Sequence, residues 1–467
     1  MKYALRGLAL AGALVGATAC NADRLDIPNY NAPTTEGVAK DPQGIQLSAT
    51  GMILAERNLY FARVRDVAVF GREGYFYFPT DARFVSNALV GVGTPPKLDP
   101  NGFYAGNWNG PFAQVRNAKN LIDAATASAL SDAQKKATLG FAETFKALAL
   151  MHILETRDSL GTPVEVNDNP NDFADFVSRD SAFKYISALL DEAKTDLQAG
   201  GATFPFVLTA GFTGFTTPTE FIKVNRALAA RNLIYRGAPR VGCGATCYTQ
   251  ALAALNESFT KTPASLSDLD IGAYNNFSTA TGDVVNGLNY EQNLSMLAHA
   301  SYAADAQKKS GGANDDRFTR KVVKLATPVA APQDLGVPAE YRFNIYTSGS
   351  SPTPVIRNEE LVLMRAEARW FTGDKANAVA DLNAVRAVSG GLGASSVTAG
   401  STDAQFIQGL LYERRYSLML EGFRWVDYRR FNLVQTLPKD LPTHFIAIVE
   451  PIPIAECDAR RVKPNGC

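Results

Sequence analysis

Apolar residues recur at three- and four-residue steps along most of this 467-residue chain, and that spacing predicts a protein built mainly of helices. We expect 108–127 to form an antiparallel pair with 131–155, and 180–199 to pair with 219–236. Ser131 is a suitable N-cap for the helix that it precedes. Two further helical patterns cover residues 41–65 and 248–259.

The segment 357–388 has the pattern of a helix–turn–helix unit. A helix is expected up to Phe371, Gly373 allows a sharp turn, and small alanines open the second helix so that it can lie close to the first. This spacing resembles a tetratricopeptide unit. One such unit cannot bury its own apolar face, so neighbouring helix pairs must stack on it. The pattern therefore predicts an all-α protein with a scaffold of stacked helix pairs.

Two long regions, 66–106 and 275–354, lack a sustained period and are rich in Gly, Pro and aromatic residues. Irregular segments of this length in a compact protein often carry function. Exposed aromatic rings can stack on sugar rings, and neighbouring Asp, Arg and Asn side chains can hydrogen-bond their hydroxyls. The candidate ligand-binding residues are Tyr75, Tyr77, Asp81, Arg83, Asn107, Trp108, Tyr290 and Tyr302. Further candidates in the second region are Asn289, Asp315, Asp316, Arg317 and Phe318. The alternative is that the aromatic run at 75–78 forms a buried edge.

The segment 405–433 combines an apolar helical stripe with an ordered series of charges. Glu421, Arg424, Asp427 and Arg430 follow at steps of three, which on a continuous helix would flank Arg424 with two carboxylates. Large aromatic residues lie between them, so we expect a partly desolvated salt-bridge network. Two carboxylates could also serve a glycosidase, but a general acid needs a raised pKa, and the neighbouring arginines favour the ionised forms.

The run ERRYSLMLEGFRWVDYRRF resembles the carboxy-terminal signature of the SusD/RagB family of outer-membrane, glycan-binding lipoproteins. Ser417 stands where the family usually has an acidic residue, and Tyr428 replaces the usual leucine. The closing VEPIPIAECDARRVKPNGC resembles the family's tail. The resemblance implies a SusD-like alpha-alpha superhelix with loop-rich insertions. It also implies capture of an oligosaccharide or other small nutrient without catalysis, and delivery to a SusC-like TonB-dependent porin.

Residues 1–19 have the pattern of a signal peptide, with Lys2 and Arg6 before a short apolar core. That core is shorter than the roughly 20 residues needed to span a bilayer. The sequence ATA before Cys20 satisfies the rule of ordinary signal peptidase and also resembles a bacterial lipobox. We expect a lipid on Cys20, a tether over 20–40 and a single domain over 41–467, anchored in the outer membrane and facing the extracellular side.

Five cysteines are present, and four of them fall into two close pairs. Cys243 with Cys247, and Cys457 with Cys467, are expected to form disulfides in an oxidising compartment, which leaves Cys20 as the odd one. The alternative is a four-cysteine metal site, but neither pair has the two-residue spacing of a zinc knuckle.

Charge and motif content exclude several classes of function. Lys plus Arg equals Asp plus Glu, at 46 each, so nucleic acid is not an expected partner. The chain has no G-x-S-x-G, H-E-x-x-H, Walker or dinucleotide-binding motif. His152 lies on an apolar helix face and is expected to be a hydrogen-bonded core residue. We therefore expect no enzyme activity, cofactor or metal; the alternatives are a secreted carboxylate-dependent glycoside hydrolase and a helical-repeat adaptor with only protein partners.

Overall fold

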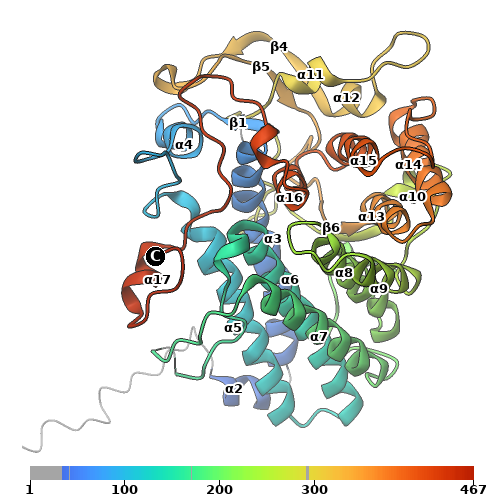
Figure 1. Ribbon diagram of the computed structural model, residues 1–467. Coiled ribbons are helices and arrows are strands. Elements are labelled where there is room, and N and C mark those ends of the chain that lie inside the picture. The colour runs from blue at the N-terminus through green and yellow to red at the C-terminus, as the bar shows by residue number, and fades with distance from the viewer. Residues whose placement is uncertain (1–33, 42, 170, 291–293) are drawn as a thin grey trace, which may run out of the picture.

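The computed structural model describes residues 34–41, 43–169, 171–290 and 294–467. The predicted signal peptide, Cys20 and most of the predicted tether lie outside the described residues. Helices dominate the described chain, which confirms the predicted all-α class, and a small region of strands covers one end of the helices (Figure 1).

Long helices form the lower half of the molecule, each packed against the next along the chain (Figure 1). They are α3 (Gly44–Phe70), α5 (Gly106–Ala127), α6 (Asp132–Arg157), α7 (Arg179–Gln198) and α8 (Pro218–Gly237), with the short α2 (Thr35–Lys40) beside them. Ser131 caps α6 as predicted, because its Oγ accepts from Gln134 N while the Gln134 side chain accepts from Ser131 N. The predicted neighbours, α5 with α6 and α7 with α8, are confirmed.

Among the described residues, α6 belongs to the one helical stretch long and apolar enough to cross a membrane, and most of its apolar window is buried in the protein. His152 on α6 lies between two carboxylates. Its Nε2 is 3.0 Å from Glu56 Oε1, and its Nδ1 is 3.0 Å from Glu155 Oε2. The prediction of a hydrogen-bonded core histidine is therefore confirmed, and burial in the core explains the hydropathy of α6.

A second group of helices continues the stack away from α8. These are α9 (Ala245–Asn256), α10 (Leu266–Leu269), α13 (Asn358–Phe371), α14 (Lys375–Gly390) and α15 (Asp403–Ser417). Gly373 adopts φ +94°, which allows the turn between α13 and α14. The Trp370 ring stacks on Phe406 of α15, with centroids 4.2 Å apart. The predicted helix–turn–helix unit is thus confirmed, and its apolar face is covered by α15.

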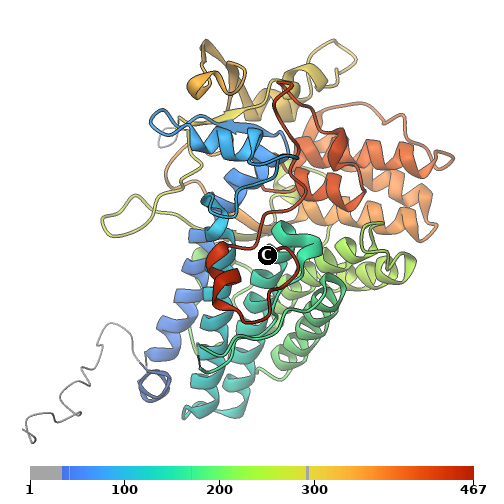
Figure 2. The ribbon, with the colours of Figure 1, turned by 60° about the vertical axis from the view of Figure 1, so that its left-hand side comes forward.

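The two irregular regions meet in one antiparallel sheet of order β1-β3-β5-β4. Its strands are β1 (Gly74–Phe76), β3 (Met296–Ala298), β4 (Val322–Val329) and β5 (Ala339–Phe343). Three short helices accompany them: α4 (Arg83–Val85), α11 (Ser301–Asp305) and α12 (Asp316–Lys321). A two-stranded ladder joins β2 (Gly272–Asn275) to β6 (Thr353–Arg357). Both views place the four-stranded sheet at the top of the molecule (Figures 1 and 2).

The segment 405–433 is not one continuous helix, so the flanking of Arg424 that a continuous helix would give does not occur. Helix α15 ends at Ser417, and α16 (Arg424–Arg430) starts after a turn in which Leu420 and Gly422 have φ of 58° and 86°. The turn places Arg424 against a backbone carbonyl, to which its Nη1 donates at 2.6 Å, instead of between two carboxylates. The chain then leads to α17 (Ile454–Ala459).

The predicted salt-bridge network nevertheless exists, with other partners. Glu421 accepts from Arg357 at 2.7 Å, and Asp427 accepts from Arg414 at 2.7 Å and Arg430 at 2.9 Å. All five side chains are buried. The broken helix therefore gathers cations from three different elements around these carboxylates.

Both predicted disulfides are confirmed. Cys243 is bonded to Cys247 and Cys457 to Cys467, with Cα atoms 5.7 and 5.6 Å apart. The second bond closes a loop at the carboxy terminus, beside α17. These four cysteines are therefore not available to a metal.

Candidate functional site

The aromatic run at the end of β1 has two sides. Successive side chains of a strand point to opposite faces, so Tyr75 and Tyr77 share one face and Phe76 and Phe78 the other. Tyr75 and Tyr77 are 1% and 2% exposed, and their rings stack 5.0 Å apart. The Tyr77 hydroxyl donates to Val337 O at 2.7 Å. These two predicted ligand residues are therefore core residues in this structure, and their expected exposure is corrected.

The opposite face of the strand leads to three phenylalanines that reach the surface, Phe78, Phe84 and Phe103, which we call the aromatic shelf. Phe78 is 39% exposed, and the other two are half-buried. The Phe84 ring lies 5.8 Å from Phe78, edge to face, and 4.4 Å from Phe103, stacked. The shelf is thus a continuous apolar surface made by β1, α4 and the turn before α5.

Buried groups hold the rings of the shelf in place from behind. Phe76 packs edge-on against Phe84 at 4.9 Å. The Arg65 guanidinium of α3 lies 4.9 Å from the centre of the Phe84 ring, and its Nε donates to Asp66 at 2.7 Å. A buried cation over an aromatic face is attractive, because the ring quadrupole is negative there. The shelf is therefore preorganised by α3.

One end of the shelf carries a polar pair that the sequence predicted. Arg83 Nε and Nη2 donate to Asp81 Oδ1 and Oδ2, at 2.9 and 2.6 Å. The Arg83 guanidinium also lies 5.0 Å from the Phe103 ring centre. The hydrogen bond from Arg83 lowers the pKa of Asp81, which keeps this carboxylate ionised. Because the Arg83 side chain is 69% exposed, the pair offers donors and acceptors beside the rings.

The other predicted ligand residues lie elsewhere. Asn107 is 4% exposed and donates to Asp66 and Glu450, both at 2.9 Å. Trp108 is also buried, stacks 5.7 Å from Phe176 and lines a separate cleft of about 370 Å³. Of the eight candidates, the structure brings Asp81 and Arg83 to the shelf, and it places Asn107 and Trp108 in the helical core.

Tyr290 and Tyr302 have different surroundings. Tyr290 is half-buried, with the Arg342 guanidinium 3.9 Å from its ring centre. Tyr302 is fully buried, and its hydroxyl donates to Glu73 at 2.9 Å. Neither ring presents an open face comparable to Phe78.

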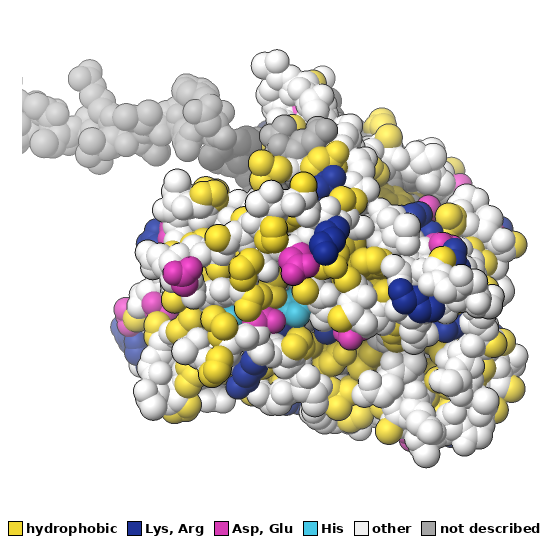
Figure 3. Space-filling view, turned by 90° about the horizontal axis from the view of Figure 1, so that it is seen from above, with side chains coloured by type: hydrophobic (Ala, Val, Ile, Leu, Met, Phe, Trp, Pro, Cys, Tyr) yellow, Lys and Arg dark blue, Asp and Glu magenta, His cyan; other side chains and the backbone are white. Residues whose placement is uncertain are grey.

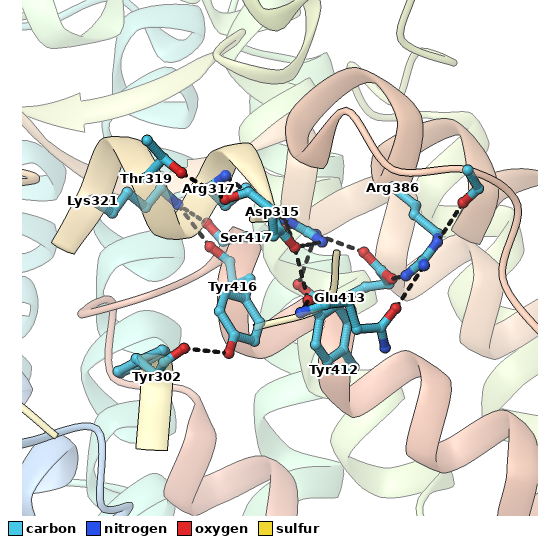
Figure 4. A network of polar contacts seen from close by, with 12 residues as sticks. Tyr302, Asp315, Arg317, Thr319, Lys321, Arg386, Tyr412, Glu413, Tyr416 and Ser417 are labelled. Carbon is cyan, nitrogen blue, oxygen red and sulfur yellow. Dashed lines mark hydrogen bonds and ion pairs between the residues drawn. The ribbon is translucent and has the colours of Figure 1, made fainter. Parts of the chain in front are cut away.

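Asp315 and Arg317, further candidates from the second irregular region, are buried too and belong to a network between α12, α14 and α15 (Figure 4). Arg317 donates to Asp315 at 2.6 Å and to Glu413 at 2.6 Å. Arg386 of α14 donates to the other oxygen of Glu413 at 2.8 Å. The Tyr412 hydroxyl donates to Asp315 at 2.9 Å. This network joins α12, α14 and α15, so its charges serve the packing of helices.

The carboxylates that suggested a glycosidase are engaged by arginines. Glu421 and Asp427 are 7% and 2% exposed, and arginine hydrogen bonds occupy both. The expected direction of the Glu421 pKa is corrected: burial raises it, although Arg357 opposes the rise. A buried carboxylate already bonded to a cation cannot reach a glycosidic bond, so this pair does not form a hydrolase site.

The upper face around the four-stranded sheet is chemically mixed (Figure 3). Hydrophobic side chains are spread over it, with Lys, Arg, Asp and Glu side chains among them. Within the described ranges, no group of three or more His, Cys, Asp or Glu side chains is placed to hold a metal ion.

Sequence reasoning chose Tyr75 and Tyr77, which are buried, and did not choose Phe78, which is exposed, or Phe84 and Phe103 beside it. Alternation along the run YFYF was the available signal, because it requires that only one of the two pairs point to the surface. Which pair does so depends on the segments that cover Tyr75 and Tyr77, and these lie far away in the sequence.

Comparison with known proteins identifies the class of fold. The structure is similar to B. fragilis NanU, with a TM-score of 0.66 and 15% identity over 94% of this chain and 100% of that chain. It is also similar to surface glycan-binding protein A from Bacteroides uniformis, with a TM-score of 0.67 and 15% identity over 91% and 99% of the two chains. A SusD-like carbohydrate-binding protein from Bacteroides fragilis matches with a TM-score of 0.63 and 14% identity, over 86% and 88%. The fold is therefore that of SusD-like proteins.

Sequence comparison adds the family. Residues 335–456 match the model of the SusD family. This segment contains α13 to α16 and the arginine ion pairs of Glu421 and Asp427. No curated protein matches the chain. The sequence match to the SusD family thus covers residues 335–456, and the similarity of fold to SusD-like proteins extends over most of the chain.

Proposed function

We propose that this protein binds oligosaccharides at the cell surface through the aromatic shelf and does not cleave them. The observation that carries the proposal is the aromatic row of the exposed Phe78 and the half-buried Phe84 and Phe103, with the Asp81–Arg83 pair at one end. Sugar rings have apolar C–H faces that pack on aromatic rings, and their hydroxyls need donors and acceptors at the rim. Solved proteins with this fold include ones named for carbohydrate or glycan binding, which supports the same ligand class.

Several features support binding without catalysis. Asp81 is ionised and paired, so it is not a general acid at neutral pH. The most strongly perturbed carboxylates, such as Glu73, are buried away from the shelf. Retaining glycosidases need two carboxyl groups about 5 Å apart across the bond to be cleaved. Asp81 is the one carboxyl group that we describe at the aromatic shelf.

A glycan array with the protein purified without its predicted signal peptide tests the ligand class. We expect binding to a subset of glycans and an affinity at least about tenfold weaker in Phe78→Ala, which corresponds to about 1.4 kcal/mol. Phe173→Ala is the matched control, because Phe173 is 41% exposed but lies in the cleft beside Trp108. Equal binding by wild type and Phe78→Ala, or release of reducing ends from a bound polymer, would contradict the proposal.

The resemblance to SusD supports a further step, delivery of the bound glycan to a SusC-like TonB-dependent transporter in the outer membrane. We expect this protein to be anchored there by a lipid on Cys20 and to face the extracellular side. Mass spectrometry of the protein from its native membrane tests the anchor, and co-purification with a TonB-dependent transporter tests the partner. An unmodified Cys20 would contradict the lipid anchor. Purification of the protein without a transporter would contradict the transporter as partner.

A further inference from the structure

A second concave region lies on the helical-repeat side of the molecule. The cleft has a volume of about 650 Å³ and is bounded by α14, α15 and the segment after α11. In Figure 1 these helices are on the right, whereas α4 of the aromatic shelf is on the left. Binding clefts for small molecules commonly enclose about 300–1,000 Å³. The cleft is therefore large enough for a short oligomer and is separate from the shelf.

The floor of the cleft is rigid. Glu413 lies between Arg386 and Arg317, which donate to its two oxygens at 2.8 and 2.6 Å (Figure 4). Arg386 also donates to the Gln307 side chain and to Gly393 O, both at 2.6 Å. Each of these bonds ties a different segment of the cleft to the buried network. A ligand would therefore meet a floor that does not need to reorganise.

The charges that line the cleft cancel. Arg386 pairs with Glu413, and Arg415 pairs with Asp305 at 2.6 Å. Arg415 is additionally held over the Tyr302 ring, 4.6 Å from its centre. Two cations and two carboxylates leave no net charge, and both cations already have anionic partners. An anionic ligand would gain no unpaired cation here, so the electrostatics favour a neutral ligand.

The open wall of the cleft is made of neutral hydrogen-bonding groups. Gln408 and Ser396 are exposed, and Ser395 and Ser401 are half-buried in the same wall. Hydroxyl and amide side chains both donate and accept, as sugar hydroxyls do. Tyr428, also half-buried, adds an aromatic surface. This combination matches a neutral polyol better than an apolar or a charged molecule.

We propose that this cleft is a second binding site of the protein, specific for short neutral oligosaccharides and independent of the aromatic shelf. The site is built on the rigid helix pair, so it would hold one sugar segment at a fixed position while the shelf holds another. Two separated sites on one chain raise the overall affinity for a long glycan, because the second contact becomes intramolecular. The shelf and the cleft are assigned from different residues, so either can fail without the other.

The test is calorimetric titration with neutral glucose and N-acetylglucosamine trimers, beside an anionic uronic acid trimer of equal length. Gln408→Trp fills the open wall, whereas Gln250→Trp places the same change on an exposed position of α9 outside the cleft. In a protein that also carries Phe78→Ala, we expect a neutral trimer to bind in the millimolar range or tighter. Gln408→Trp should weaken that binding at least about tenfold, and Gln250→Trp should not change it.

Each outcome decides one of the two proposals. If Phe78→Ala loses neutral trimer binding and Gln408→Trp binds like wild type, the cleft is not a binding site and the shelf is the site. If only Gln408→Trp loses binding, the cleft is a binding site and the shelf is not. Binding of the uronic acid trimer as tight as that of the neutral trimers, or no trimer binding in the millimolar range, would overturn the assignment of the cleft to neutral sugars.

Discussion

The buried network between α12, α14 and α15 and the Asp81–Arg83 pair use the same chemistry for different purposes. Arg317 and Glu413 are 0% and 1% exposed and bond to partners on three helices, whereas the Arg83 side chain is 69% exposed and bonds to a residue two positions away. A buried ion pair is costly to break, because the remaining charge has no water to solvate it. An exposed pair contributes little to stability, so its groups remain available to a ligand. Burial, and not residue type, therefore distinguishes the ion pairs that hold helices together from the pair that we propose contacts the ligand.

The largest expected effect comes from Glu413→Ala. The change leaves Arg386 without its carboxylate and Arg317 with Asp315 as its remaining carboxylate partner, and both arginine side chains are buried. We expect the free energy of unfolding to fall by about 3–5 kcal/mol, measured by chemical denaturation. A loss below about 1 kcal/mol would mean that the network is more hydrated than the structure indicates. The network would then not differ from the Asp81–Arg83 pair in its contribution to stability.

A buried carboxylate without an ion pair should respond to pH. Burial raises the pKa of Glu73 to about 7, although hydrogen bonds from Tyr302 and Leu420 N and the charge of Arg424 oppose the rise. The stabilising protonated form is fully present below the unfolded pKa of about 4.5 and is lost as the pH rises through about 7. Relative to Glu73→Gln, wild type should lose stability by up to about 1.4 kcal/mol per pH unit in this window.

Denaturation series for both proteins between pH 4 and 8 would measure this difference. Parallel curves for wild type and Glu73→Gln would show that Glu73 is ionised in the folded protein at neutral pH. The buried Glu73 carboxyl would then titrate like an exposed carboxyl group.

A smaller effect separates the two faces of β1. Tyr77→Phe removes the hydrogen bond to Val337 O and should cost about 1 kcal/mol of stability, because the buried carbonyl loses its donor. It should not change glycan affinity, since Tyr77 faces the core, whereas Phe78→Ala at the next position should weaken it. Thermal denaturation and glycan titration of both variants check this, and weaker glycan binding in Tyr77→Phe would contradict the assignment of faces.

The smallest effect on stability is expected for Asp81→Asn. The variant keeps an oxygen that can accept from Arg83 N, as Asp81 Oδ1 does at 3.0 Å, and loses the charge and the second acceptor oxygen of a pair whose arginine is exposed. The denaturation midpoint should not move, while affinity for the glycan found by array should fall several-fold. A shifted midpoint with unchanged affinity would assign Asp81 to the scaffold.

The scaffold was predictable because helical periodicity is local. The expected helix 108–127 corresponds to α5, Gly106–Ala127, and the unit at 357–388 to α13 and α14. The family signature is readable for a physical reason as well: Glu413 and Arg414 each form a buried ion pair and Arg415 forms a partly buried one, so their order along α15 reflects the packing. The charge pattern did not indicate that the helix ends at Ser417. A turn with positive φ separates α15 from α16 there.

The shelf was not predictable to the same degree, because it depends on pairing over long distances in the sequence. Strand β1 has three residues, and Tyr75 pairs with Leu297. The hydrophobic pattern of so short a strand does not indicate which face is covered. Only the assembled sheet decides that Tyr75 and Tyr77 are buried and that Phe78 is exposed.

The most direct test of the central claim is a crystal structure of the protein with the glycan that the array identifies. We predict a sugar ring against Phe78, with hydroxyls hydrogen-bonded to Asp81 or Arg83. A glycan bound elsewhere on the molecule, with the aromatic shelf bare at saturating ligand, would contradict the account.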